Sequence, residues 1–159
     1  MSPVLMSREW LLPDVEATQR LGASLARSLN WSERDARVVF LCGELGAGKT
    51  TLTAAALAAI GVTETVRSPS FSLIELYETT GGQAVHMDLY RLTDPAELEH
   101  LGLRDHLRGG TLLMIEWPER GAGWLPLPDL RVELLTVPQR SARIEAVTPA
   151  GRAWLERMA

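Results

Sequence analysis

The chain has 159 residues, of which 46% are hydrophobic and 23% charged, and its net charge at pH 7 is -4. This length fits one domain with its own core, and the composition excludes a wholly disordered chain. The negative net charge argues against independent, non-specific nucleic-acid binding, and no apolar run approaches the roughly 18 residues that span a bilayer. The single cysteine, Cys42, cannot form an internal disulfide, and the first residues lack a signal-peptide pattern, so we expect one cytoplasmic domain over residues 1–159.

The first third of the chain predicts a helix, a strand and a second helix. Asp14 opens a helix whose apolar positions recur at steps of three and four as far as Leu29. Residues 37–42 form a short apolar run with β-branched side chains, which is typical of a buried central strand. An alanine-rich helix is predicted over 51–60, and Gly61 ends it.

The middle of the chain predicts a β-hairpin, a capped helix and another strand. Alternating side chains over 70–78 and again over 84–90 flank a glycine-containing turn, which indicates the hairpin. Asp94 is the predicted N-cap of a helix, with a proline at N1 and Glu97 as the N3 glutamate of a capping box, and we expect this helix to extend as far as Leu107. Residues 111–117 are strongly apolar and predict a second buried strand.

The last third predicts a strand pair and a short helix. After a loop rich in proline and glycine over 121–129, the pattern favours strands over 131–137 and 142–147. Thr148 caps a final helix that carries Trp154 on its apolar side. Strands that alternate with helices predict an α/β fold with a mostly parallel central sheet, flanked by helices and extended by an antiparallel hairpin.

One glycine-rich turn carries a recognisable chemistry. Residues 43–50 match the pattern G-x-x-x-x-G-K-[ST], and their lysine, Lys49, is the only lysine among the sixteen basic residues of the chain. Such a loop lets backbone N–H groups converge on phosphate oxygens at the start of a helix. Lys49 would then reach the β- and γ-phosphates, and the Thr50 hydroxyl would bind Mg²⁺. Because a strand precedes the loop and a helix follows it, we expect a single-domain P-loop NTPase fold.

A second acidic centre is needed to hold Mg²⁺ and orient a water molecule. Glu116 closes the apolar strand over 111–117, which is the usual place for such a carboxylate, and Asp88 lies near the end of the hairpin. Both could instead be ordinary acids at a strand end or in a turn. His86 is expected to be a structural hydrogen-bonding residue and not a zinc ligand, because no histidine–cysteine cluster has metal-ligand spacing.

Two nucleotide-using classes can be weighed by what the chain lacks. With Lys49 already assigned and Asn30 the only asparagine, no N-K-x-D element exists, so guanine recognition by that route is excluded. A small-molecule kinase of this size usually carries an arginine-bearing lid. The loop over 121–129 contains no arginine, although Arg120 flanks it, so a kinase is disfavoured but stays open.

Four segments taken together resemble one family. They are residues 43–51, 68–71, 86–91 and 115–119, and their order and sequence are similar to the bacterial TsaE (YjeE) family, the ATPase of tRNA threonylcarbamoyladenosine biosynthesis. The resemblance covers nearly the whole chain. The one departure is Ser70, where the family usually has threonine, and serine keeps the hydroxyl.

The resemblance implies roles for particular residues. Lys49, Asp88 and Glu116 would be catalytic, and Thr50 with Glu116 would hold Mg²⁺. The residues that would bind ATP are Glu44, Leu45, Gly46, Ala47, Gly48, Lys49, Thr50 and Thr51, with Thr18 near the adenine. The residues that would form a switch-like loop or support the site are Ser68, Pro69, Ser70, Phe71, His86, Tyr90, Arg91 and Trp117.

The resemblance also implies partners. TsaE-like proteins act with the TsaD–TsaB pair, which modifies adenosine 37 of tRNA, so contact with tRNA is expected only through that complex and no membrane is involved. An arginine finger could come from Arg91 or from a partner. Two other functions stay open, a small-molecule kinase and a nucleotide-sensing scaffold with little turnover.

Overall fold

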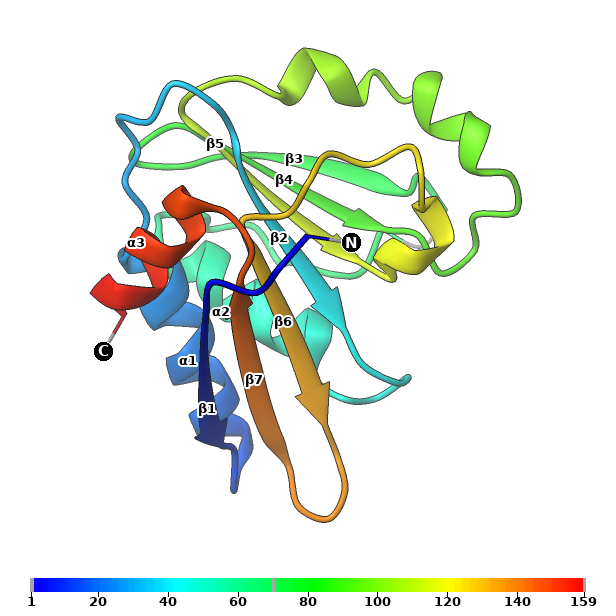
Figure 1. Cartoon of the computed structure of the whole chain (residues 1–159). Coiled ribbons are helices and arrows are strands. Elements are labelled where there is room, and N and C mark those ends of the chain that lie inside the picture. Colours follow the sequence, from blue (N-terminus) through cyan, green and yellow to red (C-terminus); the bar gives the residue numbers. More distant parts are fainter. Residues whose placement is uncertain (1, 70, 159) are drawn as a thin grey trace.

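The computed structural model describes residues 2–69 and 71–158, and within them the chain forms one seven-stranded sheet in the order β1-β7-β6-β2-β5-β4-β3 (Figure 1). The four central strands β6, β2, β5 and β4 run parallel, and antiparallel strands extend the sheet at both edges. This arrangement confirms the predicted α/β fold. The elements are β1 (Met6–Leu11), α1 (Val15–Arg27), β2 (Arg37–Cys42), α2 (Lys49–Ala59), β3 (Ile74–Glu78), β4 (Gln83–Asp88), β5 (Thr111–Glu116), β6 (Leu130–Leu135), β7 (Ser141–Ala146) and α3 (Pro149–Arg157).

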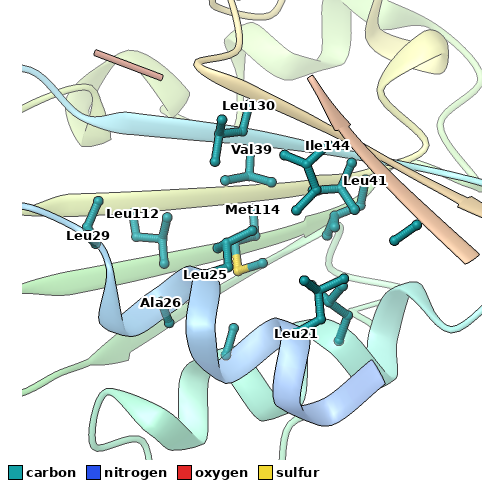
Figure 2. Packing of buried hydrophobic residues seen from close by; sticks show 14 of the residues in the cluster. Leu21, Leu25, Ala26, Leu29, Val39, Leu41, Leu112, Met114, Leu130 and Ile144 are labelled. Atoms are coloured by element: carbon teal, nitrogen blue, oxygen red, sulfur yellow. The ribbon is translucent and has the colours of Figure 1, made fainter. Parts of the chain in front are cut away.

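The sheet separates two apolar cores. On one face, α1, α2 and α3 cover the sheet, and Figure 2 shows Leu21 and Leu25 of α1 beside side chains of the central strands. The other face is covered by two short 3₁₀ helices, η1 (Pro95–Glu99) and η2 (Leu103–His106), which bury Leu98 and Leu103. Because both faces of β2 and β5 are covered, their sequences are nearly continuous apolar runs.

Helix α1 packs closely against α2. A Cβ atom added to Gly22 of α1 would lie only 2.3 Å from the carbonyl oxygen of Leu52, so glycine is needed where the two helices cross. At the start of α1, the Asp14 side chain accepts a hydrogen bond of 2.7 Å from the backbone N–H of Ala17, as the sequence predicts. The crossing holds α1 beside the beginning of α2.

Two predicted elements differ from the structure. The helix expected after Asp94 is not one α-helix but the pair η1 and η2, because Gly102 between them adopts a left-handed conformation with φ of 69°. The first hairpin strand begins at Ile74 and not at residue 70, because Leu73 has a φ of 68° and ends the turn that precedes the strand. Phe71 therefore lies in a turn, where 89% of it is exposed.

The sequence did not predict strand β1. Its inward-facing positions are the half-buried Met6, Arg8 and Trp10, so a charged residue interrupts the apolar alternation. Arg8 faces inward because its guanidinium donates hydrogen bonds to the carbonyls of Leu155 and Met158 at the end of α3. Among the described residues, no helix is long and apolar enough to cross a bilayer.

Candidate functional site

The candidate site lies where the central parallel strands end. Strand β2 ends at Cys42, β4 at Asp88 and β5 at Glu116, and Asp88 and Glu116 are direct neighbours across the β4–β5 pair. Parallel strands place their carboxyl ends at one edge of the sheet, which is where open α/β sheets bind ligands. A cleft of about 420 Å³ opens there, and it is lined by Leu45, Gly46, Gly48, Lys49, Thr50, Thr51, Ser68, Asp88, Tyr90, Arg91, Glu116 and Trp117.

The loop between β2 and α2 depends on three glycines. Gly43, Gly46 and Gly48 all have positive φ, at 148°, 82° and 110°, and the last two open the loop backbone toward the cleft. Gly48 is the N-cap of α2 and has no side chain to accept hydrogen bonds from the first N–H groups of the helix. A helix start of this kind is a site where an anion can accept those bonds.

Lys49 is enclosed by the loop that precedes it. Its ammonium group donates hydrogen bonds to the carbonyls of Gly43 and Glu44 and lies 4.2 Å from the centre of the Trp117 ring. Burial lowers the pKa of Lys49, and the nearby carboxylates of Glu116 and Asp88 oppose that effect. An anion bound in the cleft would raise the pKa of Lys49, as those carboxylates do.

Glu116 joins two other residues of the site. Both of its carboxylate oxygens lie 3.1 Å from the Thr50 hydroxyl, and Oε2 also lies 2.6 Å from Nε2 of His86. Glu116 is only 2% exposed, and His86 is fully buried. His86 was predicted to be a structural hydrogen-bonding residue, and its partner in the structure is Glu116 at the end of β5.

Asp88 is held by separate contacts. One carboxylate oxygen accepts a hydrogen bond of 2.9 Å from the backbone N–H of Tyr90, and the other accepts one from the Ser68 hydroxyl. Ser68 belongs to the segment that the sequence identified as switch-like, so this segment reaches the acid at the end of β4. Neither acid is an ordinary solvated strand end, because Asp88 is 6% exposed and Glu116 is 2% exposed.

The residues at the cleft fit a magnesium ion. The hydroxyl of Thr50 and the carboxylate of Glu116 are hard oxygen ligands, and their separation of 3.1 Å is close to the edge of an octahedron with metal–oxygen distances of about 2.1 Å. In the part of the chain that the structure describes, no cluster of three or more histidine, cysteine or acidic side chains could hold a metal. This small ligand set suits Mg²⁺, which normally keeps several waters and binds phosphate oxygens as well.

An aromatic wall completes one side of the cleft. Trp117 follows Glu116 directly and adopts a left-handed conformation with φ of 58°, which is uncommon for a bulky residue. Its ring lies 4.9 Å from that of Tyr90, and the Arg120 guanidinium lies over Tyr90 at 5.4 Å. The turn after β5 thus directs Trp117 toward Lys49, and the prediction that Trp117 lies beside the site agrees with this position.

Some residues that the sequence placed in the site do not line the cleft. Thr18 is buried on α1 and packs against the loop, since a Cβ added at Gly48 would lie 3.6 Å from its methyl group. The Glu44 side chain instead accepts a hydrogen bond of 2.6 Å from Thr136. Ala47 is buried within the loop, and Pro69 is buried beside Ser68.

The remaining switch-like residues divide between the cleft and the surface. Arg91 lines the cleft, and its guanidinium lies 5.0 Å from the centre of the exposed Phe71 ring. Ser70 falls outside the described residues, so its predicted role stays a prediction.

Two residues that contact the loop were missed by the sequence analysis. Thr136 and Arg140 lie in the connection between β6 and β7, and Arg140 donates hydrogen bonds of 3.5 Å and 3.4 Å to the carbonyls of Gly46 and Ala47. They are 92 to 94 positions along the chain from the loop residues that they contact. No local pattern could have shown this contact, because it depends on β6 lying next to β2.

A family model described as "Threonylcarbamoyl adenosine biosynthesis protein TsaE" matches residues 12–144, which include the loop, both acids and the β6–β7 connection. The chain belongs to the TsaE family. This confirms the resemblance drawn from the four sequence segments and places the protein in tRNA threonylcarbamoyladenosine biosynthesis.

Individual TsaE relatives and one solved structure agree with this assignment. The chain is 43% identical to "tRNA threonylcarbamoyladenosine biosynthesis protein TsaE" of Haemophilus influenzae over 124 residues, which cover 77% of this chain and 78% of that protein. It is 37% identical to the Aquifex aeolicus protein of the same name over 139 residues, covering 86% and 95%. The crystal structure of Bacillus subtilis YdiB matches 98% of this chain and 95% of its own with a TM-score of 0.75, and at 24% identity this likeness shows the fold alone.

Proposed function

We propose that this TsaE-family protein binds ATP with Mg²⁺, hydrolyses it, and thereby supports a TsaD–TsaB complex in modifying adenosine 37 of tRNA. The observation that carries the proposal is the meeting of four groups at one cleft. The glycine-rich loop, Lys49, Asp88 and Glu116 come from three chain segments and line the same space at the ends of β2, β4 and β5. A phosphate group in this space would meet backbone N–H groups, a cation and a metal site together.

The residues of the cleft divide the work of hydrolysis. Loop N–H groups and Lys49 would bind and orient the phosphates, and Thr50 and Glu116 would hold Mg²⁺, which neutralises charge on the phosphate oxygens. Asp88 is an oriented hydrogen-bond acceptor, because Ser68 and the backbone N–H of Tyr90 fix its carboxylate. It can therefore position a water molecule for attack on the γ-phosphate. Rate enhancement would come from positioning and charge stabilisation, without a covalent intermediate.

Turnover by the isolated protein should be slow if the arginine finger comes from a partner. Arg91 lines the cleft, but its guanidinium lies over the ring of Phe71, so an arginine from TsaD or TsaB could supply the missing charge. Such a group is worth about 10³–10⁵ in rate. Inorganic phosphate release should be measured for the protein alone and with TsaD, TsaB and tRNA. Equal rates would refute activation by the partners.

Product analysis and a tRNA modification assay separate the alternative functions. A small-molecule kinase would release ADP together with a phosphorylated metabolite and little inorganic phosphate. A nucleotide-sensing scaffold would bind ATP with little hydrolysis, and an Asp88→Ala variant would then support tRNA modification as well as the wild type does.

A further inference from the structure

His86 lies behind the cleft and not in it. It is fully buried on β4, it is not among the residues that line the cleft, and its Nε2 lies 2.6 Å from Oε2 of Glu116. Its other ring nitrogen, Nδ1, has no hydrogen-bond partner in the part of the chain that the structure describes. The imidazole therefore makes one polar contact, and that contact is to a carboxylate that faces the Thr50 hydroxyl.

The chemistry of this pair sets the direction of the bond. A carboxylate only accepts hydrogen bonds, so toward an ionised Glu116 the Nε2–H group of His86 is the donor, and Nδ1 stays without a partner. An apolar side chain of similar size would fill the same space without burying an unpaired nitrogen. The contact with Glu116 is therefore the polar interaction that accounts for a histidine at this buried position.

We propose that His86 is a positioning residue that holds the Glu116 carboxylate in the orientation needed, with Thr50, to bind Mg²⁺. The inference rests on the proposed function and assigns this residue a task within it. With Oε2 beside His86, both carboxylate oxygens lie 3.1 Å from the Thr50 hydroxyl, and Glu116 and Thr50 line the cleft together. Hydrogen bonds behind a metal ligand restrict its rotation and increase metal affinity in this way.

Two substitutions separate positioning from packing. His86→Gln keeps an N–H donor at about the reach of Nε2, whereas His86→Met keeps the volume and removes the donor. ATP affinity should be measured by competition with a fluorescent ATP analogue, once in EDTA and once across a series of Mg²⁺ concentrations. We expect His86→Met to raise the Mg²⁺ concentration needed for half-maximal effect by about 10–100-fold, while ATP affinity in EDTA stays close to that of the wild type. His86→Gln should keep most of the wild-type Mg²⁺ response.

A double-mutant cycle with Glu116→Gln tests whether His86 acts through Glu116. In the Glu116→Gln background, His86→Met should have no further effect on the Mg²⁺ requirement, because the group that it positions is already gone. Equal Mg²⁺ responses for wild type and His86→Met, or a full additional loss in the Glu116→Gln background, would overturn the inference. A wild-type protein whose ATP affinity does not depend on Mg²⁺ would instead refute the proposed metal site itself.

A measurement on the unmodified protein covers the case in which His86→Met does not fold. The buried Nε2–H should give a slowly exchanging imidazole resonance in ¹⁵N-labelled protein. Adding Mg²⁺ to the ATP-bound protein should shift this resonance, because Glu116 then shares its charge with the metal. A resonance that does not respond to Mg²⁺, in a protein whose ATP affinity does, would overturn the role of His86.

Discussion

Replacing Gly22 by alanine should destabilise the protein, although alanine is the better helix former. Gly22 lies within α1 at the crossing with α2, and a Cβ atom there would lie 2.3 Å from the Leu52 carbonyl oxygen and 3.3 Å from the Ala56 amide nitrogen. Ordinary van der Waals contact begins at 3.4 Å, so the first distance is about 1 Å too short. The obstructing atoms belong to the backbone of a packed helix, and they cannot move aside as a flexible side chain would.

The expected magnitude follows from two opposing effects. Overpacking a core costs about 1–3 kcal/mol, and a clash with helix backbone belongs at the upper end of this range. Replacing glycine by alanine inside a helix returns about 1 kcal/mol. The free energy of unfolding should therefore fall by about 2 kcal/mol, which for a domain of this size lowers Tm by about 4–8 °C.

Thermal and urea unfolding of wild type, Gly22→Ala and a control, Ser24→Ala, would test this reasoning. Ser24 is half-buried two positions along α1, so its replacement changes helix propensity without adding an atom at the crossing. The control should keep or slightly raise Tm. If Gly22→Ala is as stable as wild type or more so, helix propensity dominates and the close crossing is not the reason for glycine at this position.

Three further predictions concern the cleft. Lys49→Arg should weaken ATP binding in a direct titration, because the planar guanidinium does not fit between the loop carbonyls and Trp117. An unchanged affinity would contradict this account of the phosphate loop. Asp88→Ala should lower the rate of phosphate release with TsaD and TsaB by about 10²-fold or more while ATP binding is retained, and a loss of binding instead would remove its water-positioning role. Burial lowers the pKa of Lys49, the only lysine, below its ordinary value of 10.5. In the protein with its lysine dimethylated with ¹³C, the NMR titration midpoint of the lysine methyl groups should therefore lie at a lower pH than in an unfolded control. Folding then releases a proton from this group, so its contribution to stability should rise with pH up to 10.5, and Lys49→Met should abolish that rise.

The parts of the site that the sequence predicted well are local in the chain. Strand β2, the glycine loop and the start of α2 are consecutive, and a strand buried on both faces gives an unbroken apolar run, so the prediction for residues 37–42 agrees with β2 at both ends. Hydropathy placed Glu116 and Asp88 near strand ends, although the strand predicted over 84–90 continues two residues past the end of β4 at Asp88. Their direct pairing could not be predicted, because it depends on β4 and β5 being parallel neighbours in one particular register.

Other elements could not be predicted because a single residue departs from the local sequence pattern. Strand β1 contains an inward-facing arginine that binds the end of α3, which breaks the apolar alternation that marks a strand. The helix predicted after Asp94 has a proper start, but the left-handed Gly102 divides it and the segment forms 3₁₀ turns. In both cases a tertiary contact or a backbone conformation overrides the local pattern.

The sequence by itself determined the fold class, the phosphate-loop motif and the two acids, because each is written in a short stretch of chain with its own pattern. Only the tertiary structure decided how they work together. It paired Asp88 with Glu116, joined Glu116 to Thr50 and His86, and brought the β6–β7 connection onto the loop. These contacts join residues 28 or more positions apart, and contacts of that kind depend on strand order and register, which no local pattern specifies.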